Sequence, residues 1–106
     1  MKTVRIHRAV VKAIEPLETN LKRELADALA LLAEGESLGL PLSRPMPRIA
    51  SGAHELRLRD KKGIYRVFYF TNVQNAILLF HFFKKKTRTT PKKEIIIAAK
   101  RLKEML

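Results

Sequence analysis

The sequence predicts an α+β fold, in which an antiparallel sheet of three to four strands carries N-terminal helices on one face and a C-terminal helix. Apolar residues recur at helical spacing between residues 21 and 32, alternate from residue 53 to 60, and return to helical spacing after residue 94. With 106 residues the chain has material for one hydrophobic core, so a single domain over residues 1–106 is expected. The absence of cysteine excludes a disulfide scaffold and a thiolate zinc site.

The part of the chain before the sheet is expected to hold a short strand and two helices. Residues 4–6 alternate with charged residues as an edge strand does, and residues 9–14 can form one or two helical turns before Pro16. A longer helix is expected between Asn20 as N-cap and Gly35 as the glycine after its last turn. Its apolar stripe consists of Leu21, Leu25, Ala28, Leu29 and Leu32.

The sheet is expected to follow a connector rich in proline and glycine. Residues 37–52 should be a loop or an extended segment, because proline lacks the amide hydrogen that a helix needs. Residues 53–60 then alternate as a half-exposed strand, and Asp60-Lys-Lys-Gly63 has the composition of a type I turn. Residues 64–70 and 76–83 are apolar on both faces, as central antiparallel strands are.

A final helix is expected to start with Thr90 as N-cap and Pro91 at its first position. Its apolar stripe consists of Ile95, Ala98, Ala99, Leu102 and Met105. The predicted order of elements is therefore β-α-α-β-β-β-α.

The charge of the chain is large and unevenly placed. The sequence has 22 Lys and Arg against 10 Asp and Glu, a formal charge of +12, and residues 1–40 contain six of each sign. The whole excess thus lies in residues 41–106, which is typical of a protein that faces a polyanion, although a solvated basic face is the simpler alternative. No apolar run reaches the roughly 20 residues that span a bilayer. We therefore expect a cytoplasmic protein with no membrane partner.

Arg66 is the unusual residue of the predicted sheet. It lies within an apolar strand, and a guanidinium stays charged, so it needs solvent, a salt bridge to Glu55 or Glu94, or a bound anion. A two- or four-residue loop in the preceding hairpin would place Arg57 directly opposite Arg66, where two like charges would hold an anion between them. A three-residue loop with a bulge at Gly63 would instead turn Arg66 to the opposite face.

A run of cations follows the last predicted strand. It comprises Lys84, Lys85, Lys86, Arg88, Lys92 and Lys93, with no acidic residue between them. A strand end followed by a helix N-terminus favours a nearby phosphate, although such a run is also common on solvated surfaces. The spacing of the three histidines does not resemble a metal site, and His81, within an apolar strand, is expected to be a hydrogen-bonded core residue.

Four segments follow one another in the order seen in a known superfamily of toxins. They are Glu55-Leu-Arg57; Tyr65-Arg-Val-Phe-Tyr-Phe70; Leu79-Phe-His81 with Lys84-Lys85; and Thr90-Pro91 with Glu94-Ile95 and Ala98. Over residues 53–101 the sequence resembles the RelE/ParE toxins of type II toxin–antitoxin systems, and most nearly the HigB-like, phage-derived branch. The resemblance implies a RelE-like domain, a cognate antitoxin with a helix-turn-helix domain and an acidic contact segment, and cleavage of mRNA on the ribosome without a metal or other cofactor.

The resemblance also implies roles for particular residues. Arg57 matches a basic site position on the first strand of the hairpin, and Arg66 matches the arginine that contacts the scissile phosphate. Lys84 and Lys85 match the basic residues after the last strand. The sequence departs from the family pattern at His54, where an aromatic residue is frequent, and at Phe82, where the family often has glycine.

The chemistry of RNA cleavage fits these residues. The 2′-hydroxyl of RNA can attack the adjacent phosphate, so the protein needs only to align the chain, move protons and neutralise charge. Arg57, Arg66 and Lys85 are expected to neutralise charge. The proton acceptor is Glu55, His54 or His81, and Glu55 is preferred because it shares the face of Arg57 on its strand. Further contacts to RNA phosphates are expected from Arg59, Lys84, Lys86, Arg88 and Lys92.

Two other functions fit the same sequence. A gyrase-directed toxin of the ParE type would bind its target protein and cleave nothing. A non-catalytic RNA-binding protein would account for the charge equally well.

Overall fold

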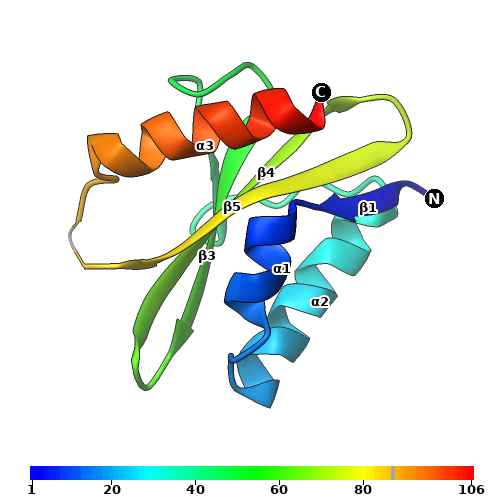
Figure 1. Ribbon diagram of the computed structural model, residues 1–106. Helices are drawn as coiled ribbons and strands as arrows, with labels where there is room; N and C mark the ends of the chain where they lie inside the picture. Colours follow the sequence, from blue (N-terminus) through cyan, green and yellow to red (C-terminus); the bar gives the residue numbers. More distant parts are fainter. Residues whose placement is uncertain (87) are drawn as a thin grey trace.

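The computed structural model describes residues 1–86 and 88–106, which form three helices and one five-stranded sheet (Figure 1). The elements are β1 (Thr3–Ile6), α1 (Arg8–Ile14), α2 (Thr19–Ala33), β2 (Ser43–Pro45), β3 (Ala53–Asp60), β4 (Gly63–Val73), β5 (Ala76–Lys85) and α3 (Lys92–Met105). The α+β class is as predicted. Within the described ranges, no helix has both the length and the apolar character that a bilayer crossing requires.

The sheet has the strand order β1-β5-β4-β3-β2, and the prediction of three to four antiparallel strands is wrong in two respects. First, β1 pairs in parallel with β5, which is possible because a long crossover separates the two strands in the chain. Second, β2 forms an extra edge strand against β3 within the connector that the sequence indicated as a loop. Pro45 ends this strand, and proline is tolerated there because an edge strand need not donate every amide hydrogen.

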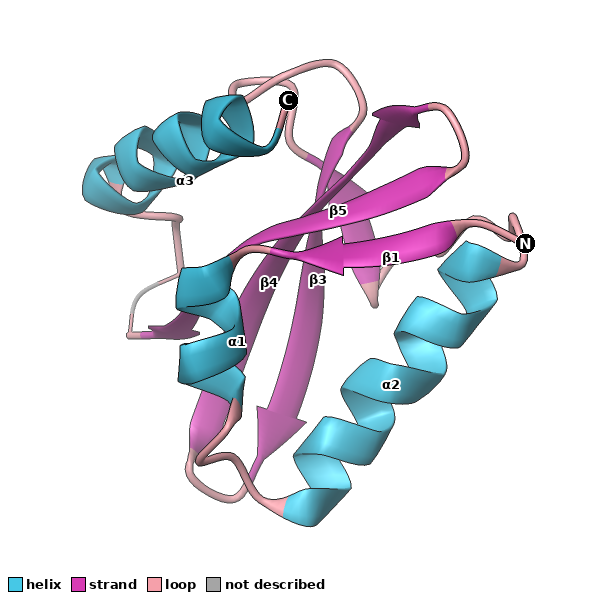
Figure 2. Ribbon diagram, turned by 45° about the vertical axis from the view of Figure 1, so that its right-hand side comes forward, coloured by secondary structure: helices cyan, strands magenta, loops and turns pink. Residues whose placement is uncertain are grey.

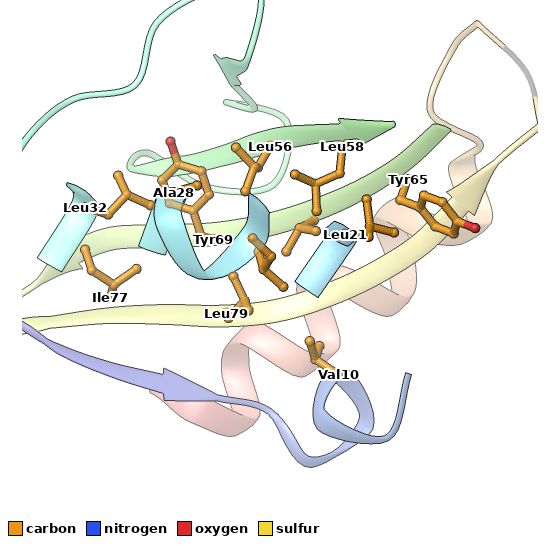
Figure 3. Close-up of a cluster of buried hydrophobic side chains, with 12 residues drawn as sticks. Val10, Leu21, Ala28, Leu32, Leu56, Leu58, Tyr65, Tyr69, Ile77 and Leu79 are labelled. Carbon is orange, nitrogen blue, oxygen red and sulfur yellow. The ribbon is translucent and has the colours of Figure 1, made fainter. Parts of the chain in front are cut away.

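The helices lie on both faces of the sheet (Figure 2). On one face, α1 and α2 pack against Leu56, Leu58 and other side chains of β3, β4 and β5, as Figure 3 shows. On the other face, α3 contributes Ala98 and Leu102 to a second cluster with Phe68 and the strands around it. The C-terminal helix is thus separated from the N-terminal helices by the sheet, and the two faces carry two distinct hydrophobic cores.

Two helix starts differ from those predicted. The helix α2 begins at Thr19 after Glu18, so Asn20 lies inside the helix and is not its N-cap. The helix α3 begins at Lys92, with Pro91 at the N-cap position in place of Thr90. Both helices lack a side-chain cap, so their start is set by the extended backbone of the residue that precedes them.

The β3–β4 hairpin has a two-residue loop. Asp60 pairs with Gly63, and the carboxylate of Asp60 accepts hydrogen bonds from the amides of Lys62 (2.8 Å) and Gly63 (3.2 Å). This register places Arg57 directly opposite Arg66, so the alternative with a bulge at Gly63 does not occur. Both arginines therefore point to the same face of the sheet.

The strand β5 contains a β-bulge at Phe80. Before the bulge Leu79 pairs with Tyr69, and after it His81 pairs with Phe68, so Phe80 is an extra residue. The bulge changes which residues of β5 share a face, because side chains alternate along a strand. As a result, His81, Phe83 and Lys85 point to the α3 face.

The end of α2 gives a first testable prediction. Gly35 adopts a φ of +92° after the last turn, as predicted for the glycine that ends this helix, and its amide donates to the carbonyl of Leu32. We expect Gly35→Ala to lower the free energy of unfolding by about 1 kcal/mol, because alanine is strained at this φ. Urea denaturation measures the change.

Gly39→Ala is the matched control. An added Cβ meets no described atom within 4 Å at either glycine, but of these two residues it is Gly35 that has a strongly positive φ. The control should therefore leave the stability unchanged or raise it slightly. Equal losses for the two variants would contradict a conformational role for Gly35.

Candidate functional site

Most of the side chains expected at the site lie on the α3 face of the sheet. Directly opposed residues of antiparallel strands share a face, so the register defines three rows across β3, β4 and β5. The rows are Glu55, Phe68 and His81; Arg57, Arg66 and Phe83; and Arg59, Ile64 and Lys85. Phe68 and Phe83 belong to the core beneath α3, which shows that the charged members of the rows border that core.

Glu55 is the buried centre of this region. Its side chain is 0% exposed, and one carboxylate oxygen accepts hydrogen bonds from Arg66 and from Nε of Arg44 (2.9 Å). The other oxygen accepts a hydrogen bond from the hydroxyl of Thr90 (2.9 Å). Of the two salt-bridge partners that the sequence allowed for Arg66, Glu55 is the one that binds it, while Glu94 binds His81.

Arg66 is a buried cation that depends on Glu55. Its side chain is only 1% exposed, and burial followed by the nearby Arg44 lowers the pKa of Arg66. Its Nε lacks a hydrogen-bond partner among the described residues. An ion pair removed from water is stable only while both charges remain, so Arg66 and Glu55 act as one unit at the base of the site.

The charges that a ligand can reach surround this buried pair. Arg57 is exposed beside Arg66. The pKa of Lys85 is lowered, first by its burial and then by the positive charges of Arg66, Arg57, Arg44 and Arg88. Like charges held close together in this way form a strongly positive surface, which suits a phosphate group. We call these five residues the cationic cluster.

The other basic residues of the predicted site are spread more widely. The ammonium group of Lys84 lies 5.9 Å from the centre of the Tyr65 ring, on the face that carries α1 and α2. Lys86 is exposed just after β5, and Lys92 is exposed at the first position of α3. The structure therefore brings Lys85 into the cationic cluster and places Lys84, its neighbour in sequence, on the opposite side of the sheet.

His54 lies away from the cationic cluster. Its ring stacks on Tyr69, with ring centres 5.1 Å apart, and Tyr69 belongs to the core beneath α1 and α2. Burial lowers the pKa of His54. The residue is therefore part of the opposite face and does not face Arg57.

His81 is a buried link between β5 and α3. One ring nitrogen lies 2.7 Å from Glu94 and the other lies 2.8 Å from a guanidinium nitrogen of Arg101. Because arginine can only donate, Nδ1 accepts and Nε2–H donates to the carboxylate, which is the neutral form of the ring. Desolvation, the largest effect, lowers the pKa of His81 and favours this form. His81 is a hydrogen-bonded core histidine, as predicted.

Two residues of the site were not indicated by the sequence. Arg44 pairs with Glu55 across β2 and β3, but it lies in a proline-rich segment without a strand pattern. Thr90 matched the composition of a helix N-cap, yet its hydroxyl binds Glu55. The one sequence signal for these two residues is Glu55. A buried carboxylate beside a buried arginine requires further hydrogen-bond donors, and Arg44 and Thr90 are those donors. In the described ranges, no three His, Cys, Asp or Glu side chains gather as a metal site requires.

Comparison with known proteins identifies the class of this domain. Residues 12–103 match the family model described as phage-derived protein Gp49-like (DUF891). Since the match covers most of the chain, the protein belongs to this Gp49-like family, a RelE-like toxin family of toxin–antitoxin systems. The resemblance to RelE-like toxins is confirmed at this level, and the HigB-like branch stays a prediction. No curated protein matches the chain.

The buried pair gives a second testable prediction. We expect Glu55→Gln to lower the free energy of unfolding by about 3–5 kcal/mol, because Arg66 then stays buried without a counter-charge. The exposed Glu36 provides a control, and Glu36→Gln should change stability by less than about 0.5 kcal/mol. Urea denaturation followed by circular dichroism measures both. Similar small losses for the two variants would show that the pair does not support the fold.

Proposed function

We propose that this protein is the toxin of a type II toxin–antitoxin pair and that it cleaves mRNA on the ribosome by attack of a 2′-hydroxyl on the adjacent phosphate. The observation that carries the proposal is the cationic cluster, in which Arg44, Arg57, Arg66 and Lys85 share one face of the sheet and Arg88 follows β5. Membership of the Gp49-like family supports the toxin class. The ribonuclease activity is our inference from the site, and the HigB-like character is inferred from the resemblance of the sequence.

The positions of the cations suit the charge that develops during RNA cleavage. The 2′-oxygen forms a bond to phosphorus as the P–O5′ bond breaks, which leaves a 2′,3′-cyclic phosphate, and the departing 5′-oxygen takes up a proton from water. The phosphorane-like transition state of this step carries more negative charge than the substrate. Arg57 and Lys85 come from neighbouring rows on opposite sides of β4, and we expect a phosphate bound between them to contact both side chains. Arg66 contributes its positive charge from below, and Glu55 fixes its position.

The proton acceptor is best supplied by Lys85. Both oxygens of Glu55 are occupied by hydrogen bonds, His54 lies on the opposite face, and His81 is held by α3. Lys85 is partly exposed within the cluster, and its partial burial, followed by the cations around it, lowers its pKa, which raises the fraction of the neutral amine at a given pH. We therefore assign proton abstraction to Lys85 rather than to Glu55, the residue preferred from the sequence.

The same surface suits regulation by an antitoxin. A segment rich in Asp and Glu would cover the cationic cluster, neutralise it and exclude RNA. Binding of such a segment should weaken as the salt concentration rises, because the attraction is between exposed charges.

A pair of neighbouring lysines provides the third prediction. We expect Arg57→Ala and Lys85→Ala to reduce mRNA cleavage by about 10²-fold or more and to relieve growth arrest, because Arg57 neutralises charge on the reacting phosphate and Lys85 accepts the proton of the 2′-hydroxyl. Lys84→Ala removes an identical side chain from the opposite face of the sheet, where α1 and α2 lie, and should keep most of the activity. Mapping of transcript ends after induction, together with growth curves, measures these effects.

The outcome also separates the alternative functions. Equal effects of Lys84→Ala and Lys85→Ala would contradict the assignment of the site to the α3 face. Growth arrest by the wild type with intact transcripts and altered DNA supercoiling would indicate a gyrase-directed toxin. Absence of any growth effect would favour passive RNA binding. Arg66→Ala is a poor test, because it removes the buried counter-charge of Glu55 and leaves only the part-exposed Arg44 to pair with it, so the variant would lose stability as well as activity.

A fourth prediction concerns pH. If Lys85 accepts the proton, the cleavage rate of the wild type rises with pH, because the neutral amine becomes more abundant as the pH approaches the lowered pKa of Lys85. Lys85→Arg keeps the positive charge but cannot lose its proton, so it should bind RNA and cleave it very slowly at every pH. Rates in a purified translation system test this, and a fully active Lys85→Arg variant would rule out the role.

A further inference from the structure

A cleft lies beside the cationic cluster, between the β2 region and the segment that precedes α3. Its volume is about 300 Å³, at the lower end of the range for small-ligand sites. Three arginines line it, and exposed prolines form an apolar wall. The lining includes Arg44, Pro45, Pro47, Arg48, Arg88 and Thr90.

Both walls of the cleft are fixed to the same buried carboxylate. Glu55 accepts a hydrogen bond from Arg44 on the β2 wall and another from Thr90 on the wall before α3. The β2 wall is also anchored by Met46, which is buried beneath α3 and whose amide donates to the carbonyl of Ala53 (2.8 Å). The width of the cleft is therefore set by the fold before any ligand binds, which reduces the entropy lost on binding.

We propose that this cleft binds one nucleotide of single-stranded RNA, next in the strand to the phosphate held by the cationic cluster. A nucleotide combines a flat base with a charged phosphate, and the cleft offers prolines and guanidinium planes for the base and arginine charges for the phosphate. The side chain of Arg44 is 42% exposed while its Nε is held by Glu55, so the guanidinium is oriented before the ligand arrives. The inference rests on the proposed function, since both sites would bind the same strand.

The cleft is continuous with the cationic cluster through two shared residues. Arg44 and Arg88 line the cleft, and the same two arginines lower the pKa of Lys85. A strand whose scissile phosphate lies at Lys85 thus reaches the cleft with its neighbouring nucleotide. An acidic peptide would use the arginines but would gain less from the apolar wall of Pro45 and Pro47, so the lining favours RNA.

Arg48 allows a specific test because it is exposed, lines the cleft and lies outside the cationic cluster. The probes are a five-nucleotide RNA and a dinucleotide, each with a 2′-deoxy sugar at the position of attack so that neither is cleaved. We expect Arg48 to contact the phosphate on the far side of the nucleotide in the cleft, so Arg48→Ala should weaken binding of the five-nucleotide RNA about tenfold, the value of one charge-assisted contact. The dinucleotide lacks this second phosphate, so its affinity should be unchanged. Calorimetry at fixed salt measures both affinities.

Arg23→Ala is the matched control, because it removes one exposed positive charge from α2 on the other side of the sheet. It should leave both affinities unchanged. Equal weakening by the two variants would overturn the cleft and indicate a general effect of charge. Unchanged RNA binding by Arg48→Ala, with weaker binding of a ten-residue glutamate peptide, would overturn it in favour of an acidic protein.

The same measurements distinguish failure of the cleft proposal from failure of the nuclease proposal. If the wild type cleaves no mRNA but Arg48→Ala selectively weakens the five-nucleotide RNA, the nuclease proposal fails and the cleft stands. If the wild type cleaves mRNA and Arg48→Ala binds the five-nucleotide RNA normally, the nuclease proposal stands and the cleft is overturned.

Discussion

The hydrogen bonds of the buried Glu55 carboxylate are the interaction on which the face that carries the cationic cluster depends. This carboxylate lies on β3 and binds three donors from three other parts of the chain: Arg66 on β4, Arg44 on β2 and Thr90 before α3. A single negative charge thus neutralises part of a strongly positive surface and fixes the segments that carry the rest of that surface. Without it, like charges on adjacent strands would repel each other at close range.

The two faces of the sheet differ in composition, since one is almost wholly apolar and the other is partly charged. The face beneath α1 and α2 is a hydrophobic core along most of β3, β4 and β5. The opposite face is a core only where α3 covers it, and charged rows continue beyond that core to the hairpin. The arrangement allows a small domain to bury enough apolar surface for stability and still present closely spaced cations on rigid strands.

Much of the fold could be predicted from local patterns. The bounds of β3, the end of α2 at Gly35 and the chemistry of the Asp60 turn all follow from periodicity and from residues with specific conformational preferences. The strand β2 could not be predicted, because three residues ending in proline carry no period. The role of Thr90 was hidden for a different reason: a hydroxyl before a proline fits a helix cap equally well. For the hairpin register the sequence allows either a two- or four-residue loop or a three-residue loop with a bulge at Gly63. The pairing of Asp60 with Gly63 in the structure decides between these registers.

The bulge at Phe80 gives β5 two phases of alternation within one strand. Without the extra residue, the even-numbered positions after Phe80 would continue to point toward α3, and Lys84 rather than Lys85 would lie beside Arg57. The backbone geometry at Phe80, and not the chemistry of the lysine side chains, thus determines which of the two lysines lies on the α3 face. Members of the family should therefore be compared by strand register, because a relative without the bulge would carry the equivalent lysine one position earlier.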